Sequence, residues 1–90
     1  MEKLQKLELM DKVVRELEDL KNSQESVIKK ITQIEAHNIN LSDSNLEKLL
    51  SDIHEHVAEN LIKVEEVTLA FQQQTEQYAE ANSLVLEEAA

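Results

Sequence analysis

The sequence has no glycine, no proline and no cysteine, and aromatic residues make up only 2% of it. Sheet-rich folds need turn residues at regular intervals, so the lack of glycine and proline argues against them. Without cysteine the chain can form neither a disulfide nor a thiolate metal site. A glycine-rich phosphate-binding loop is excluded as well. No apolar run is long enough to span a bilayer, so we expect no membrane insertion.

Basic residues are scarce, above all in the second half. The 90 residues contain nine Lys and Arg against 19 Asp and Glu, which gives a net charge of −10, and no basic residue follows Lys63. Nucleic-acid binding depends on clustered Lys and Arg that neutralise phosphates, so we expect no nucleic-acid partner. The acidic surface indicates a soluble protein, and it is also suited to steering a basic partner.

What the chain does contain is typical of long helices, because Glu, Leu, Lys, Gln and Ala dominate. In the first half, apolar residues alternate in steps of three and four, as at positions a and d of a heptad repeat. This series consists of Met10, Val13, Leu17, Leu20, Val27, Ile31 and Ile34. Val14 and Ile28 widen the stripe, which suits a bundle helix. The polar residues 21–26 leave open a break that would give three helices.

The second half repeats more regularly. One series at intervals of seven residues consists of Leu50, Val57, Val64, Phe71, Tyr78 and Val85. The complementary heptad position holds Leu46, Ile53, Asn60, Val67, Gln74 and Ala81. This pattern predicts one continuous helix.

A single loop-like stretch, between residues 36 and 50, separates the two patterns. Asn38 or Asn40 can adopt the left-handed conformation that ends a helix. Ser44 and Glu47 have the spacing of a capping box that starts one. We therefore predict one all-α domain over residues 1–90, a hairpin of two long antiparallel helices. The first helix is predicted at about 3–37, the turn at 38–43 and the second helix at about 44–87.

Two antiparallel helices cover only one side of each wide stripe. Burying one Leu, Val or Ile side chain contributes about 1.5–3 kcal/mol, so the uncovered side favours association. We expect a four-helix bundle, formed as a homodimer or as a heterodimer with another helical protein. The predicted interface residues are Leu17, Leu20, Ile31, Ile34, Leu50, Ile53, Val57, Val64, Val67, Phe71 and Tyr78.

Three amide side chains interrupt the apolar heptad positions: Gln24, Asn60 and Gln74. They have two interpretations. Either they fix register and partner choice, since a misaligned pairing would strand a buried amide, or they lie where the bundle opens to solvent.

Few residues are suited to metal binding or catalysis. His54 and His56 lie on nearly opposite sides of a helix and cannot share one metal ion. The zinc-protease pattern His-Glu-x-x-His fails, because residue 58 is Ala. Asp52 and His56 are predicted to form a surface pair. We predict no catalytic, cofactor-binding or metal-ligating residue and no cofactor, and we expect a non-enzymatic protein–protein interaction module.

The arrangement resembles the WXG100 (ESAT-6-like) family, whose members are acidic, dimeric hairpins of two long helices. The segment "AFQQQTEQYAEANSLVLEEAA" is similar to that family's C-terminal segment, where a Tyr followed four residues later by an acidic residue forms part of a secretion signal. Here Tyr78 matches the Tyr, whereas Asn82 stands at the acidic position and the turn lacks the family's Trp-x-Gly. The resemblance implies a partner or targeting factor of a type VII secretion effector, with Phe71, Tyr78 and Asn82 as the targeting face.

The amphipathic pattern begins directly after Met1, so no secretory signal peptide is predicted. We expect a cytoplasmic protein for which export by a signal-peptide-independent route stays open. The alternative hypothesis is a general coiled-coil adaptor, or an assembly subunit of a larger complex, with no secretion role.

Overall fold

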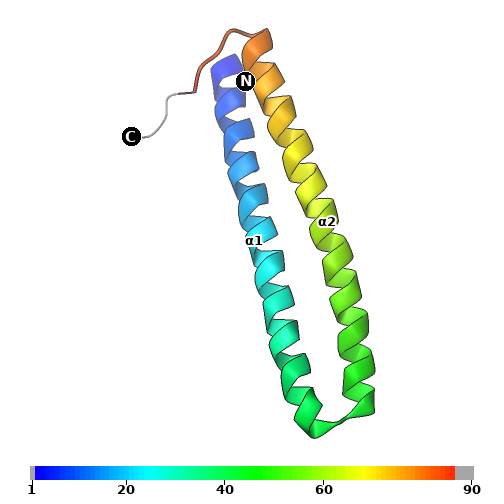
Figure 1. The fold of residues 1–90 in the computed structure, drawn as a ribbon. Helices are drawn as coiled ribbons and strands as arrows, with labels where there is room; N and C mark the ends of the chain where they lie inside the picture. The colour runs from blue at the N-terminus through cyan, green and yellow to red at the C-terminus, as the bar shows by residue number, and fades with distance from the viewer. Residues whose placement is uncertain (1, 87–90) are drawn as a thin grey trace.

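The computed structural model describes residues 2–86, which form two long helices joined by a tight turn (Figure 1). Helix α1 spans Lys3–Leu41 and helix α2 spans Ser44–Ala81. The two helices pack side by side in opposite directions, and the molecule measures 60 × 25 × 18 Å. The predicted all-α helical hairpin is confirmed. Because α1 is continuous through residues 21–26, the three-helix alternative is excluded.

The turn is shorter than predicted, since α1 continues past residue 37 to Leu41. Ser42 adopts the left-handed conformation, with φ of 54°, in place of Asn38 or Asn40. Asp43, rather than Ser44, caps α2, because its side chain accepts a hydrogen bond from the Leu46 amide at 2.8 Å.

Asn38 explains why the helix extends across poor helix formers. Its side chain is buried and binds the backbone of Asp43 twice. The Asn38 Nδ2 atom donates to the Asp43 carbonyl at 3.0 Å, and the Asp43 amide donates to Asn38 Oδ1 at 3.2 Å. Asn38 therefore stays helical and holds the turn closed from inside the hairpin.

Helix α2 ends at Ala81 instead of near residue 87, which itself lies outside the described residues. Tyr78, one turn before this end, already contacts Lys3 at the start of α1. Asn82 donates a hydrogen bond to the Tyr78 carbonyl at 2.9 Å, and Ser83 has a positive φ. Residues 82–86 then turn back toward the start of α1 (Figure 1).

The contact between the helices uses heptad positions a and e. Met10 and Leu50 stand at position a, so Val13 and Ile53 stand at d, and Val14 and His54 at e. From Leu7 onward in α1 these positions hold Leu7, Met10, Val14, Leu17, Lys21, Gln24, Ile28, Ile31, Glu35 and Asn38, all buried or half-buried. From Leu50 onward in α2 they hold Leu50, His54, Val57, Leu61, Val64, Thr68, Phe71, Thr75 and Tyr78, again buried or half-buried. The buried hydroxyls of Thr68 and Thr75 donate to the carbonyls of Val64 and Phe71 at 2.6 and 2.8 Å. These two polar residues can therefore lie in the contact between α1 and α2, which we call the seam, because each hydroxyl already has a hydrogen-bond acceptor.

Candidate functional site

The d positions of both helices lie on one broad side of the hairpin, outside the contact between the helices. This follows because the helices are antiparallel and both turn positions a and e toward each other. We call this side the open face. Each d position of α1 has a d position of α2 at about the same height. Taken in order from the turn to the termini, these pairs are Leu41–Leu46, Ile34–Ile53, Val27–Asn60, Leu20–Val67, Val13–Gln74 and Lys6–Ala81.

Cross-hairpin contacts align these pairs to within about one helical turn. His54 lies 3.1 Å from Glu35, which places the neighbouring Ile34 and Ile53 side by side. Asn60 Nδ2 donates to Gln24 Oε1 at 3.0 Å, one helical turn from Val27. At the other end, the Lys6 ammonium lies 5.0 Å from the centre of the Tyr78 ring. The open face is thus a ladder of residues that runs the length of the hairpin.

The open face is apolar over its turn-proximal part and remains accessible to solvent. Leu20, Ile53 and Val67 are 44%, 48% and 52% exposed. Val13 and Leu46 are half-buried, whereas Leu41 at the turn is 69% exposed. A contiguous apolar strip of this kind is unusual on a surface that faces only water.

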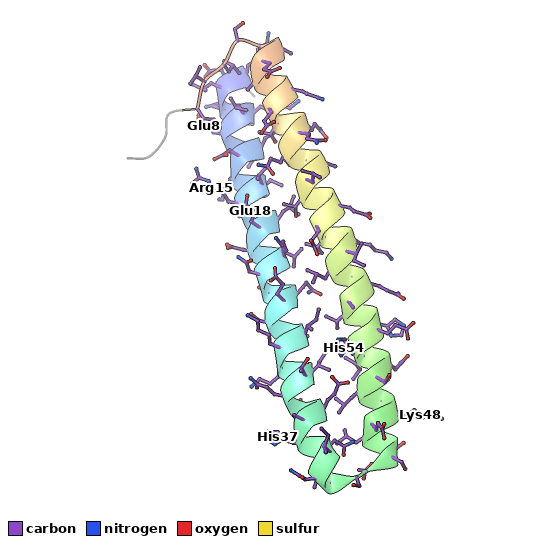
Figure 2. All side chains as sticks on the ribbon, viewed as in Figure 1. Glu8, Arg15, Glu18, His37, Lys48 and His54 are labelled. Atoms are coloured by element: carbon purple, nitrogen blue, oxygen red, sulfur yellow. The ribbon has the colours of Figure 1, made fainter. Side chains whose placement is uncertain are left out.

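The acidic residues avoid the open face. The open face consists of the d positions, and the g positions of α1 and α2 lie along its outer edge. Within the two helices, Glu16 is the only carboxylate at any of these positions. Lys30, Lys63, His37 and His56 occupy the same edge. The carboxylates lie instead on the other sides of the helices. Figure 2 shows, for example, Glu8 on the side of α1 that faces away from α2. A chain with a net charge of −10 therefore presents one broad side that is apolar and slightly basic at its edge.

The predicted interface residues divide into two groups. Leu17, Ile31, Leu50, Val57, Val64, Phe71 and Tyr78 lie in the contact between α1 and α2. Leu20, Ile34, Ile53 and Val67 lie on the open face. The first group closes the hairpin, and the second group is available to another molecule.

The three residues of the predicted targeting face do not form a freely exposed surface. Phe71, Tyr78 and Asn82 are each half-buried. The Tyr78 hydroxyl lies 3.5 Å from the Lys3 carbonyl, and Asn82 caps α2. These residues are therefore tied to α1 and to the end of α2.

The contact between His54 and Glu35 was not predicted from the sequence. Both residues occupy position e, and Figure 2 shows His54 directed toward α1. Charged residues at matching e positions of two facing helices are the signal that would have revealed this pair. Asp52 and His56, by contrast, form the predicted surface pair, with His56 Nδ1 at 3.6 Å from Asp52 Oδ1.

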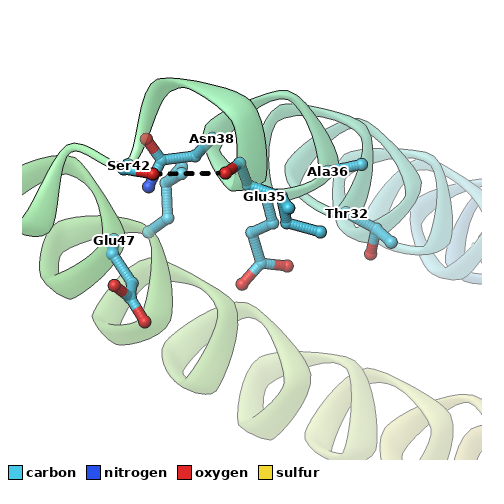
Figure 3. Close-up of a pocket in the computed structure, with 8 residues that line it drawn as sticks. Thr32, Glu35, Ala36, Asn38, Ser42 and Glu47 are labelled. Atoms are coloured by element: carbon cyan, nitrogen blue, oxygen red, sulfur yellow. Dashed lines mark hydrogen bonds between the residues drawn. The ribbon is translucent and has the colours of Figure 1, made fainter.

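A hollow lies beside the turn (Figure 3). Its lining comprises Thr32, Glu35, Ala36, Asn38, Ile39, Ser42, Glu47 and Leu50. Most of its polar groups already have partners within the chain: Asn38 binds Asp43, Glu35 binds His54, and the Ser42 hydroxyl donates to the Ile39 carbonyl at 3.3 Å. These groups stabilise the turn and the neighbouring part of the seam.

Residues 2–86 bring together no group of three His, Asp or Glu side chains that could hold a metal ion. Neither α1 nor α2 contains a stretch that is long and apolar enough to cross a membrane.

Comparison with known proteins gives no match: no family model fits this chain, and no curated protein or solved structure is significantly similar to it. The resemblance to WXG100 proteins therefore stays an expectation.

Proposed function

We propose that this chain is a non-enzymatic interaction module that docks its open face onto another helical protein. The observation that carries the proposal is the coincidence of two patterns on one side of the hairpin. The apolar d positions gather there, and the carboxylates, apart from Glu16, are kept away. A surface meant only for solvent gains nothing from excluding charge, whereas a docking surface avoids the cost of burying it.

The small core supports the same proposal. Only Leu7, Met10, Val14, Ile31 and Leu50 are buried apolar side chains within the described residues. A chain of this size with so short an apolar seam is marginally stable alone. Covering the open face would add several side chains to the core, at about 1.5–3 kcal/mol for each one fully buried.

The chain offers a matched control for a test. Ile53 and Val67 lie on the open face, whereas Ile62 and Leu69 lie at position f of the same helix and are similarly exposed, at 56% and 58%. The double variant Ile53→Glu/Val67→Glu should abolish association, and the control Ile62→Glu/Leu69→Glu should leave it intact. The measurement is molar mass by light scattering, for the chain alone and after co-expression with the products of neighbouring genes.

Association that survives the open-face variant, or a monomer under both conditions, would overturn the proposal. Because all four positions are exposed, circular dichroism should show unchanged helicity for both double variants.

A second candidate function follows from the resemblance to WXG100 proteins: a partner or targeting factor for a type VII secretion effector. The acidic helical hairpin and the placement of Tyr78 near the end of α2 support this candidate, whereas Asn82 departs from the acidic residue of the family's signal. In a host with that machinery, Tyr78→Ala should abolish appearance of the chain in the medium while its mass in solution stays the same. Unchanged secretion of the variant would contradict this role.

The alternative is an adaptor or assembly subunit without any role in secretion. It uses the same open face, and it predicts that the chain purifies within a larger complex whose other members include no secretion component. Gene neighbourhood and the composition of that complex distinguish the two roles.

A further inference from the structure

We infer that the occupant of the open face is a second copy of this chain, docked with both turns at the same end. This inference rests on the proposed function, since it uses the same surface. It specifies the partner and the direction in which the partner lies.

The area is sufficient for a stable dimer. The broad side of the hairpin measures 60 by 25 Å. About half of that side would supply the roughly 800 Å² per partner that specific complexes bury. Two hairpins stacked face to face would form a four-helix bundle, in which each α1 lies against the α2 of the other copy.

The open face is graded along its length, and this grading sets the direction. Its turn end carries the pairs Leu41–Leu46 and Ile34–Ile53, whereas its other end carries Gln74 and Lys6. With both turns at one end, apolar pairs meet apolar pairs, and the polar ends meet where water has access. With the turns at opposite ends, Gln74 of each copy would lie against Ile53 of the other, which strands an amide.

The electrostatics are compatible with this direction but do not select it. In either direction every helix has only antiparallel neighbours, so the helix dipoles oppose one another favourably. When the turns lie together, α1 lies against α2 of the other copy. The edge of α1 that carries Glu16 then runs along the edge of α2 that carries Lys63 and no carboxylate. No two carboxylates of the open face or its edge are brought together.

Spin-label distance measurements test the inference directly. The chain has no cysteine, so one introduced cysteine gives one label per copy. Ser44→Cys places the label at the turn, and Ser26→Cys places it near the middle of α1; both positions are exposed. Ser26→Cys should give a distance between copies under about 35 Å in either direction of docking, so it reports dimer formation alone. Ser44→Cys should give less than about 30 Å when the turns lie together and about 40 Å or more when they are opposed, given the helical rise per residue.

Short distances from both labels support the inference. A short distance from Ser26→Cys with a long one from Ser44→Cys would overturn it, because the copies would then be opposed. A monomer that shows no distance between copies would also overturn it. In that last case, a complex with another protein that is broken by Ile53→Glu/Val67→Glu would leave the proposed function standing, and the absence of any such complex would remove both.

Discussion

Asn60 donates a hydrogen bond from its Nδ2 atom to Gln24 Oε1 over 3.0 Å, near the middle of the hairpin. The two amides belong to different parts of the structure, since Gln24 lies in the contact between α1 and α2 and Asn60 lies on the open face. The bond marks the register of the two helices. It also places one polar layer within an otherwise apolar strip between Ile53 and Val67.

Replacement of Asn60 by Leu should strengthen association and weaken its specificity. A polar residue at a core heptad position typically costs stability while it selects one alignment. We expect Asn60→Leu to lower the dimer dissociation constant at least severalfold, as measured by sedimentation equilibrium. The exposed Asn45→Leu serves as the control and should have little effect. A higher dissociation constant for Asn60→Leu would contradict the assignment of this residue to a docking surface.

Leu7 should be among the residues most important for the stability of the hairpin. Its side chain is fully buried, whereas Leu4, one turn earlier, is 40% exposed. Leu7→Ala should reduce the free energy of unfolding by about 2–5 kcal/mol, because it leaves a cavity in the seam. Leu4→Ala should cost less than about 1 kcal/mol. Equal losses in urea denaturation would mean that the seam does not run along positions a and e.

Asn38 should matter far more than Asn40, although both stand in the same polar stretch. Asn38 is buried and bonded to Asp43 at 3.0 and 3.2 Å, whereas Asn40 is exposed. Asn38→Ala leaves the Asp43 amide without its partner, whereas the Asp43 carbonyl keeps the Glu47 amide at 3.0 Å, so we expect a loss of about 1–3 kcal/mol in thermal or urea unfolding. The paired change Asn40→Ala should be close to neutral, and the reverse ranking would contradict the described turn.

The contact between His54 and Glu35 should contribute little energy. Both side chains are more than one third exposed. A double-mutant cycle with His54→Gln and Glu35→Gln should give a coupling of about 1 kcal/mol or less. The same cycle on His56 and Asp52, which are about two-thirds exposed or more, should give a still smaller value. A coupling energy well above this range would show that His54 and Glu35 are less exposed to solvent than the structure indicates.

The hairpin was predictable because the heptad spacing of the apolar residues dictates long helices. The sequence did not predict which heptad positions pack between α1 and α2 and which stay exposed. Leu61, Thr68 and Thr75 occupy the e row of α2 that packs against α1, and the two threonines gave no apolar signal. Their hydroxyls bond within the helix, so polar residues take core places that the hydrophobic pattern assigned to Ile53 and Val67.

The turn was likewise predicted in its composition but not in the role of each residue. The sequence indicated a glycine-free turn built from Asn, Ser and Asp, and the structure has one. Which residue takes which role depends on the fit between the two helices. Asn38 is recruited from inside α1 to bind Asp43, and this leaves Ser42 to adopt the left-handed conformation.

Hydroxyl-radical footprinting of the native protein at micromolar concentration tests the docking of the open face most directly. In a single hairpin, Ile53 and Val67 are about as exposed as Ile62 and Leu69. We predict that Ile53 and Val67 are protected from oxidation severalfold relative to Ile62 and Leu69, and that dilution to the monomer removes the difference. Equal oxidation of the two pairs in the associated protein would contradict the account.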